Sequence, residues 1–320
     1  MTAMSDRWLR AVHLAVPAGL LLAQFVLPPF HHGMLTRIMV LSAYTVGYNV
    51  LLGYTGLMSL GHAMFFATGM YATGLVVYYL HWGVIPAMLA GLGASIVVPV
   101  VIGVITLRTT GVSFLIVTMM FAQAFFLATL NFNRVTGGDQ GLVLTGRIPP
   151  LHLGPLQVGL ADAAVKYNFA FLVFVAAFIF SLWLVRSPAG RVWVAIRENE
   201  ERTRLLGFDT FRYKLLALAI SGAIAGVAGS TYTLLFSYLG ASFASILYSI
   251  FPLLWTLVGG IGTVIGPLVG TALMTYAVDI TSGITDAYLV AVGAVLVVLI
   301  IRFPRGIMGA VRARWWPWLP

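Results

Sequence analysis

Long apolar stretches, separated by short polar breaks, run through nearly the whole of this chain. A stretch of about 20 apolar residues can cross the hydrocarbon core of a bilayer as a helix. Only 8% of the 320 residues are charged, against roughly 25% in soluble domains. We therefore predict an all-α, polytopic membrane protein in which residues 1–320 form a single transmembrane domain. The expected spans cover residues 12–29, 35–53, 57–80, 84–107, 111–130, 166–185, 215–238, 242–259, 263–281 and 286–302.

The number of spans depends on residues 242–281, which can hold either two spans or one span and a re-entrant segment. Basic residues of membrane proteins concentrate on the cytoplasmic side, so the distribution of Lys and Arg can discriminate between a ten-span and a nine-span chain. Ten spans place most of the 18 Lys and Arg residues in the cytoplasm, whereas nine would move the basic C-terminal tail to the opposite face. We therefore expect about ten transmembrane helices, with both termini cytoplasmic. No small-residue cleavage site follows the first span, so it is expected to be retained.

Residues 187–214 gather ten charged side chains in the run SPAGRVWVAIRENEERTRLLGFDTFRYK. Ser187 is a preferred N-cap, and Pro188 suits the first position of a helix. Gly207 is placed to end that helix, and a second helix is expected to start at Asp209 or Thr210. The segment is therefore predicted to form a helix, a glycine turn and a helix in the cytoplasm, rather than only a solvated connection.

The first of these two helices is expected to have an apolar face and a charged face. Glu198 and Arg202 are four residues apart, as are Glu200 and Arg204, so both pairs are predicted to form ion pairs. A capped, two-sided helix of this kind suits contact with a partner protein. The apolar stripe consists of Val192, Ala195, Ile196 and Leu206.

The longest external segment, residues 131–165, is rich in glycine and proline. These residues favour turns, so a short hairpin-like excursion is expected there. We interpret this segment as a periplasmic loop that is available to a soluble external protein.

Several kinds of function are disfavoured by what the chain lacks. No G-x-x-x-x-G-K-[ST] motif occurs, so the chain has no P-loop of its own for ATP. Secondary transporters couple to ions through ionisable groups buried at mid-membrane, and few such groups occur in these spans. A proton-coupled secondary transporter is therefore disfavoured but stays an alternative. The main polar candidates within the spans are Gln24, Asn49, His62 and Gln123.

No enzyme, metal site or cofactor is expected. Ser59 and His62 stand three residues apart on one expected helix face, whereas a nucleophile and its base usually come from separate elements. Cysteine is absent, and no carboxylates accompany the loop histidines at ligand spacing. The net charge of +9 is attributed to contact with anionic membrane lipid, not to nucleic acid. These loop histidines are His31, His32, His81 and His152.

Glycine is concentrated at two expected helix junctions, YNVLLGYTGLMSLGHAMFFATGMYATG and VGGIGTVIGPLVG. Broken helices of this kind line transport paths, but small residues equally allow ordinary close packing of helices. Both interpretations stay open. Both junctions fall on the cytoplasmic side, so an inverted repeat is not supported. The polar residues beside the first junction are candidates for the translocation path; they are Asn49, Thr55, Ser59 and His62.

Five blocks occur in a characteristic order over roughly residues 47–309. They are YNVLLGYTGLMSLGHAMFFATGMYA, RVTGGDQGL, GRVWVAIRENEERTRLLGFDTFRYKLLALAISGAIAGVAG, LVGGIGTVIGPLVGTAL and RFPRGIMG. In this order they resemble the permease subunits of bacterial branched-chain amino acid ABC transporters, the LivH/LivM family, and the LivM side in particular.

The resemblance implies a type II ABC importer permease of the bacterial inner membrane, a transport subunit and not an enzyme. It implies a second, homologous permease subunit, two cytoplasmic ATP-binding subunits and a periplasmic substrate-binding protein as partners. It also implies that residues 187–214 are the coupling loop that docks on an ATPase. The matching coupling positions are Ala195, Ile196, Arg197, Glu198, Gly207, Tyr213 and Lys214.

The same resemblance favours leucine, isoleucine and valine as substrates. Asp139 and Gln140 stand where the family varies, so urea, short amides or aromatic acids stay open as substrates.

Overall fold

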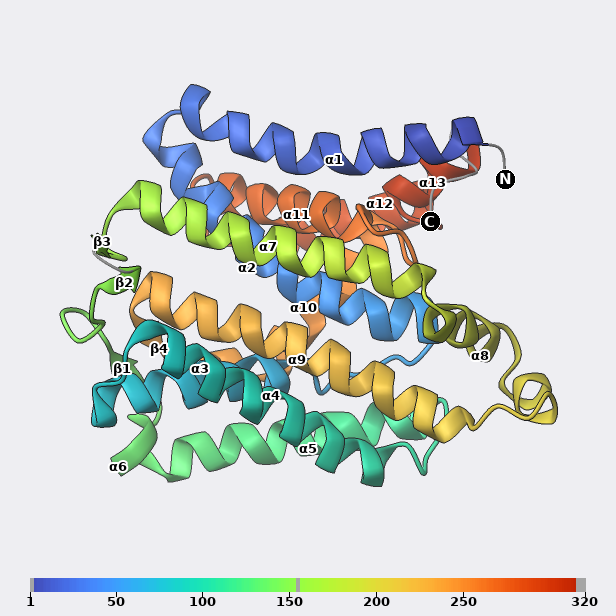
Figure 1. The fold of residues 1–320 in the computed structure, drawn as a ribbon, viewed down its shortest axis with the longest axis horizontal. Helices are drawn as coiled ribbons and strands as arrows, with labels where there is room; N and C mark the ends of the chain where they lie inside the picture. The colour runs from blue at the N-terminus through green and yellow to red at the C-terminus, as the bar shows by residue number, and fades with distance from the viewer. Residues whose placement is uncertain (1–2, 154–155, 315–320) are drawn as a thin grey trace.

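The computed structural model describes the backbone of residues 3–153 and 156–314, and the side chains of residues 12–151 and 159–314. The side chains of Arg7, Arg10 and His152, and the end of the basic tail at 315–320, lie outside the described residues. Nearly all regular structure is helical, and the longest helices run side by side along the long axis (Figure 1). The helices are α1 (Ala3–Val26), α2 (Pro29–Asn49), the π-helix η1 (Val50–Tyr54), α3 (His62–Leu80), α4 (Val84–Thr106), α5 (Val112–Asn131), α6 (Asn133–Thr136), α7 (Ala163–Arg186), α8 (Pro188–Leu205), α9 (Thr210–Phe236), the 3-10 helix η2 (Ala241–Ala244), α10 (Ile246–Gly259), α11 (Gly266–Ser282), α12 (Tyr288–Arg302) and α13 (Ile307–Arg314).

In the described part of the chain, 7 helical segments are long and apolar enough to cross a membrane. The chain is thus a helical, multi-pass membrane protein, as predicted, while the count of about ten spans stays a prediction. The uncertain region 242–281 forms two helices, α10 with 14 residues and α11 with 17, each shorter than the ~20 residues of a typical span. The 7 segments are Pro29–Tyr54, His62–Leu80, Val84–Thr106, Val112–Asn131, Ala163–Arg186, Thr210–Phe236 and Tyr288–Arg314.

The helix α2 lies at the centre of the bundle, and its residues from Ile38 onward are buried. It packs against α7, α9 and α11, while α3, α4 and α9 pack closely on one another. A Cβ atom on Gly69 of α3 would overlap the carbonyl oxygen of Gly226 in α9. The two backbones therefore touch, which small residues permit in membrane helices.

Four short strands lie at one end of the molecule, opposite α8 (Figure 1). The strands β2 (Leu151–Leu153) and β3 (Leu156–Val158) form an antiparallel hairpin, so the hairpin expected within residues 131–165 is confirmed. A second pairing was not anticipated. It joins β1 (Leu142–Val143) to β4 (Tyr238–Leu239) and so ties this external segment to the connection that follows α9.

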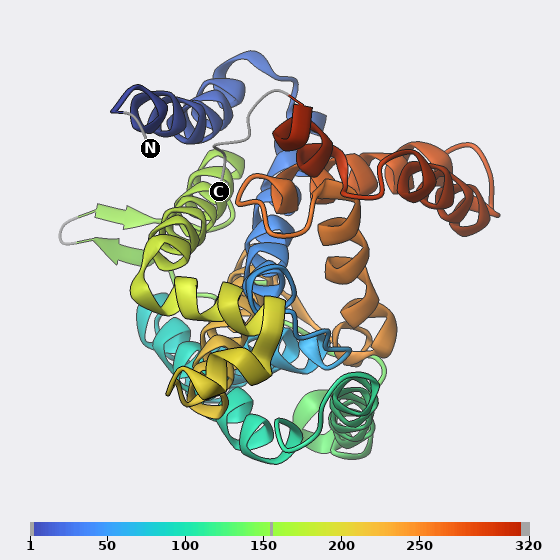
Figure 2. The ribbon, with the colours of Figure 1, turned by 90° about the vertical axis from the view of Figure 1, so that its right-hand side faces the viewer.

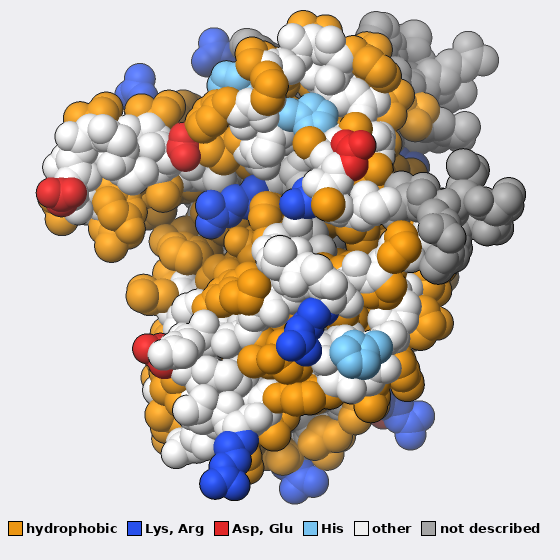
Figure 3. All heavy atoms as spheres, turned by 90° about the vertical axis from the view of Figure 1, so that its left-hand side faces the viewer, with side chains coloured by type: hydrophobic (Ala, Val, Ile, Leu, Met, Phe, Trp, Pro, Cys, Tyr) orange, Lys and Arg blue, Asp and Glu red, His pale blue; other side chains and the backbone are white. Residues whose placement is uncertain are grey.

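The other end of the molecule carries α8. The first turns of α1 and the helix α13 both lie at this end (Figure 1). Figure 2 views this end directly and shows that α12 projects sideways from the body of the bundle. Figure 3 shows the opposite end, where basic side chains lie close to the place at which the projecting part joins the body.

Candidate functional site: the α8 segment and the glycine junction

The segment around α8 starts and ends at the residues that the sequence indicated. The Oγ of Ser187 accepts a hydrogen bond from the amide of Gly190 at 3.2 Å, and Pro188 occupies the first turn. Gly207 has φ of +90°, a conformation that favours glycine, and it turns the chain after α8. Asp209 then caps α9 by accepting from the amide of Arg212 at 3.2 Å. The predicted start of the first helix, the glycine turn and the start of the second helix are confirmed.

Within α8, however, the helix breaks at Asn199, where φ is −160° and ψ is 100°. The Oδ1 of Asn199 accepts a hydrogen bond from the amide of Arg202 at 2.8 Å, and the hydroxyl of Thr203 donates to its carbonyl at 2.9 Å. Asn199 therefore acts as an N-cap in the middle of the segment. The prediction of one continuous helix up to Gly207 was wrong, although asparagine is a preferred capping residue.

The break at Asn199 also changes the ion pairs. Among the described residues, neither of the two predicted pairs along α8 forms, because Asn199 separates Glu198 from the following turn and Glu200 has another partner. The Oε1 of Glu200 lies 2.6 Å from the Nζ of Lys214 in α9, whose side chain is 5% exposed. Lys214, a predicted coupling residue, thus links the two helices.

The apolar stripe of α8 is shorter than predicted. Val192 and Ile196 are buried, but Leu206 is 71% exposed because it lies beyond the break. Trp193 was overlooked, although it lies beside Val192 in the stripe. It is fully buried, and its Nε1 donates to the carbonyl of Tyr213 at 2.8 Å. The first half of α8 is therefore firmly packed against α9.

Arg197 connects α8 to the first glycine-rich segment. Its guanidinium donates a hydrogen bond to the carbonyl oxygen of Gly53 in η1. The stem of the side chain passes so close to Gly56 that a Cβ there would lie 2.8 Å from the Cγ of Arg197. A Cβ on Gly262 would likewise lie 3.1 Å from the guanidinium. Arg197 thus sits against both glycine-rich segments.

The two segments meet at what we call the glycine junction, residues 50–61 and 260–265. Asn49 joins them, since its Nδ2 donates to the carbonyl of Thr263 at 2.9 Å and its Oδ1 accepts from the amide of Gly262 at 3.0 Å. Arg312 of α13 donates to the carbonyl of Gly262 at 3.4 Å. Residues 57–61, which were predicted to begin a span, are not helical, and α3 begins at His62.

All four predicted path residues lie at or beside this junction, and each is at most 2% exposed. The expectation that Ser59 and His62 share a helix face was wrong, because Ser59 precedes α3. Its Oγ accepts from the amide of Gly61 at 3.1 Å, while the Nε2 of His62 lies 2.7 Å from the Oγ of Ser221 in α9. The hydroxyl of Thr55 donates to the carbonyl of Val50 at 3.2 Å. All four side chains are thus buried, and each takes part in a hydrogen bond at the junction.

Comparison with known proteins agrees with this arrangement. The profile of the family described as "Branched-chain amino acid transport system / permease component" matches residues 32–302. The chain belongs to this family. The permease is 29% identical over 301 residues to LivM of Salmonella typhimurium, covering 87% of this chain and 69% of that protein. It is 28% identical over 301 residues to LivM of Escherichia coli, again covering 87% of this chain and 69% of that protein. No solved structure matches it.

The permease also resembles LivH of Escherichia coli, with 25% identity over 291 residues, which cover 82% of this chain and 89% of that protein. The LivM and LivH proteins are named as high-affinity branched-chain amino acid transport system permease proteins. Membership of this family identifies the chain as a transport subunit.

The outermost part of α8 and the turn that follows it present an unusual surface for the permease. Leu205, Leu206 and Phe208 are exposed there, next to the exposed charges of Glu201 and Arg204. Exposed apolar side chains that are rimmed by charge mark protein contacts. Of the predicted coupling residues, Arg197, Glu198 and Gly207 are exposed, whereas Ile196 of α8 and Lys214 of α9 are buried.

Proposed function

We propose that this permease is the membrane subunit of an ABC importer that moves branched-chain amino acids inward across the bacterial inner membrane, driven by separate ATPase subunits. The names of the LivM and LivH relatives support the substrate class. About ten spans with cytoplasmic termini remain part of the proposal. The helix α13 and the start of α1 lie at the same end of the molecule as α8, which supports a common side for all three (Figure 1).

The α8 segment is the proposed docking site for an ATPase subunit. It combines a rigidly held first half with an exposed apolar and charged end, formed by Leu205, Leu206 and Phe208. Its seven coupling residues divide between these two tasks. Ala195, Ile196, Arg197, Tyr213 and Lys214 hold the segment to the bundle, while Glu198 and Gly207 face a partner.

The hydrogen bond from Arg197 to Gly53 is the observation that carries this proposal. It joins the docking segment directly to the glycine junction, where Asn49 holds the two broken segments together. A displacement of α8 by a closing pair of ATPases would therefore pull on the junction itself. We assign Asn49, Thr55, Ser59 and His62 to the closed inner end of the translocation path.

The partners follow from this division of work. A second, homologous permease subunit completes the pathway, two ATP-binding subunits contact the α8 segments, and a periplasmic binding protein meets the end that carries the strands. Because the binding protein selects the solute, a related importer for urea, short amides or aromatic acids would share this architecture.

The coupling proposal is tested with Gly207→Arg and with the charge reversal Glu198→Lys in the full transporter. Glu198 is exposed, so the fold should tolerate its charge reversal, whereas Gly207→Arg also strains the turn, whose φ of +90° favours glycine. We expect ATP-dependent uptake and co-purification of the ATPase subunits to fall together. If both measurements stay at the wild-type level, the coupling role is wrong. Uptake that persists in vesicles without an ATPase partner would favour a secondary transporter.

The path assignment is tested by alanine substitution at each of the four residues. We expect altered uptake in a transporter that still assembles, because each side chain holds a hydrogen bond at the closed junction. Unchanged uptake in all four variants would reject the assignment.

A further inference from the structure

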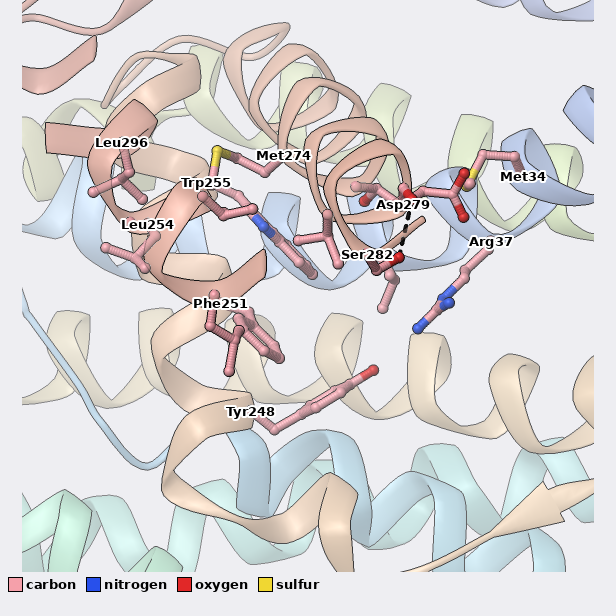
Figure 4. Close-up of a pocket in the computed structure, with 16 residues that line it drawn as sticks. Met34, Arg37, Tyr248, Phe251, Leu254, Trp255, Met274, Asp279, Ser282 and Leu296 are labelled. Carbon is pink, nitrogen blue, oxygen red and sulfur yellow. Dashed lines mark hydrogen bonds between the residues drawn. The ribbon is translucent and has the colours of Figure 1, made fainter. Parts of the chain in front are cut away.

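A cavity of about 330 Å³ lies between α2, α10, α11 and α12, on the side where α12 projects from the bundle (Figures 2 and 4). Its volume is at the lower end of the ~300–1,000 Å³ of small-molecule sites. Most of its wall is apolar, and its polar groups are few. The apolar wall includes Phe251, Leu254, Trp255, Met274 and Leu296.

Arg37 is the first charged group of the cavity. It lies in the membrane-spanning segment Pro29–Tyr54, about two turns after α2 begins. Among the described residues it forms no ion pair, and Figure 4 shows its guanidinium pointing towards the hydroxyl of Tyr248. An arginine inside a membrane span is costly unless it faces a cavity or a partner, and such residues mark substrate pathways.

Two further polar groups in the wall come from α11. The carboxylate of Asp279 lines the same cavity, and the described residues give it no basic partner within ion-pair distance. The hydroxyl of Thr275 is buried in this wall, and no hydrogen-bond partner for it occurs among the described residues. Buried polar groups normally find a partner, so this cavity offers hydrogen bonds that the described chain does not use.

We propose that this cavity binds the substrate as an α-amino acid zwitterion, with Arg37 holding its carboxylate and Asp279 its ammonium. A guanidinium matches a carboxylate with two parallel hydrogen bonds, which makes arginine selective for this group. The branched aliphatic side chain packs against Phe251, Trp255 and Met274. This inference rests on the proposed function, and it adds the site at which the amino acid head group is recognised.

The position of the cavity suits an early step of transport. Asp279 and Ser282 lie in the last turns of α11, and Arg37 in the first turns of α2, at the end opposite α8. The closed glycine junction lies at the other end of these helices. A solute released at the strand-bearing end would therefore meet the cavity before it meets the junction.

The first test is leucine uptake by the full transporter, with its binding protein, in proteoliposomes. Arg37→Gln and Asp279→Asn should each reduce uptake by at least about 10-fold, as expected for loss of a hydrogen bond to a charged group. Arg37→Lys, which keeps the charge, should retain more uptake than Arg37→Gln. Arg108→Gln and Asp286→Asn change the same charges at exposed positions outside the cavity wall, and should leave uptake unchanged.

The second test measures recognition of the amino acid head group directly. It compares the melting temperature of the assembled transporter with different ligands at millimolar concentration. Leucine should stabilise the wild type more than leucinamide, which lacks the carboxylate, or 4-methylpentanoate, which lacks the ammonium. Arg37→Gln should abolish the preference over leucinamide only, and Asp279→Asn the preference over 4-methylpentanoate only. Absence of any stabilisation of the wild type by leucine would count against the site.

The outcomes separate this inference from the proposed function. A wild-type transporter that moves no branched-chain amino acid would overturn the proposed function. Leucine uptake by the wild type, with both variants matching their controls, would overturn only the cavity assignment. If the Arg37→Gln variant no longer co-purified with the second permease subunit, Arg37 would belong to a subunit interface. That result would also overturn the cavity assignment.

Discussion

The ammonium of Lys214 lies 2.6 Å from a carboxylate oxygen of Glu200, so an ion pair joins the outer half of α8 to the first turns of α9. Lys214 is buried, whereas the side chain of Glu200 is 39% exposed. Glu200 directly follows the break at Asn199, so the pair ties the outer half of α8 to α9. The orientation of the docking surface therefore depends on one largely buried lysine.

Replacement of Glu200 by Gln should destabilise the α8 segment by about 1–2 kcal/mol, because it leaves the buried ammonium of Lys214 without its counter-charge. Uptake should fall with it. Glu201→Gln is the matched control, since Glu201 is the exposed neighbour and forms no ion pair in the described part of the chain. Thermal unfolding of the detergent-solubilised transporter measures the difference. Equal stability of the two variants would contradict the structural role of the pair.

Replacement of Arg197 by Ala should uncouple the transporter. The ATPase subunits should still co-purify, because the exposed end of α8 is unchanged, but uptake per ATP hydrolysed should fall about 10-fold, within the usual range of coupling energies. Arg191→Ala removes an exposed arginine from the same helix and should have little effect. Parallel uptake and ATPase assays separate the two quantities. Normal coupling in Arg197→Ala would show that the link to Gly53 transmits nothing.

Replacement of Asn49 by Leu should destabilise the permease by about 2–4 kcal/mol. The change removes both hydrogen bonds of the side chain and leaves the amide of Gly262 and the carbonyl of Thr263 buried without partners. Asn131→Leu serves as the control, because this exposed side chain bonds only within its own helix. Its effect should stay within about 0.5 kcal/mol. Denaturant unfolding in detergent gives both values, and similar losses would argue against a special role for Asn49.

Replacement of Gly69 by Ala should cost about 1–3 kcal/mol, because the added methyl group would overlap the backbone of α9 and the backbone cannot move aside. Gly93→Ala adds the same group to α4 where no atom lies within 4 Å. That change should be neutral, or stabilising by up to about 1 kcal/mol through helix propensity. The yield of monodisperse protein and its melting temperature compare the two variants. A stable Gly69→Ala protein would mean that α3 and α9 are less closely packed.

Features that depend on a few neighbouring residues were predictable from the sequence. Ser187, Gly207 and Asp209 act through hydrogen bonds and backbone conformations within three or four residues, so their roles as caps and turn were correctly expected. The long apolar segments were predictable for a similar reason, because hydrophobic length alone decides whether a helix can cross a bilayer. The two glycine-rich segments lie at junctions between helices, as expected, between η1 and α3 and between α10 and α11.

Features that depend on distant contacts were not predictable. The ion pairs along α8 failed because Glu200 meets Lys214 from the next helix, and an i,i+4 rule cannot foresee a tertiary partner. The irregular residues 55–61 have an apolar composition that reads as helix, so the separation of Ser59 from His62 was missed. Arg37 and Asp279 stand far apart in the sequence, and only the fold brings them to one cavity.

The π-helix at Val50–Tyr54 carries the wider turn that a single extra residue produces in an α-helix. Each residue of a regular helix advances the chain by about 100° around its axis. Shortening this turn by one residue would therefore rotate everything before it relative to everything after it by about a quarter of a circle. Asn49 and Gly53 would no longer meet Gly262 and Arg197 at the same time. This turn determines the rotation of the residues before it relative to the residues after it. An insertion or deletion of one residue here would therefore change which side chains face each other across the junction.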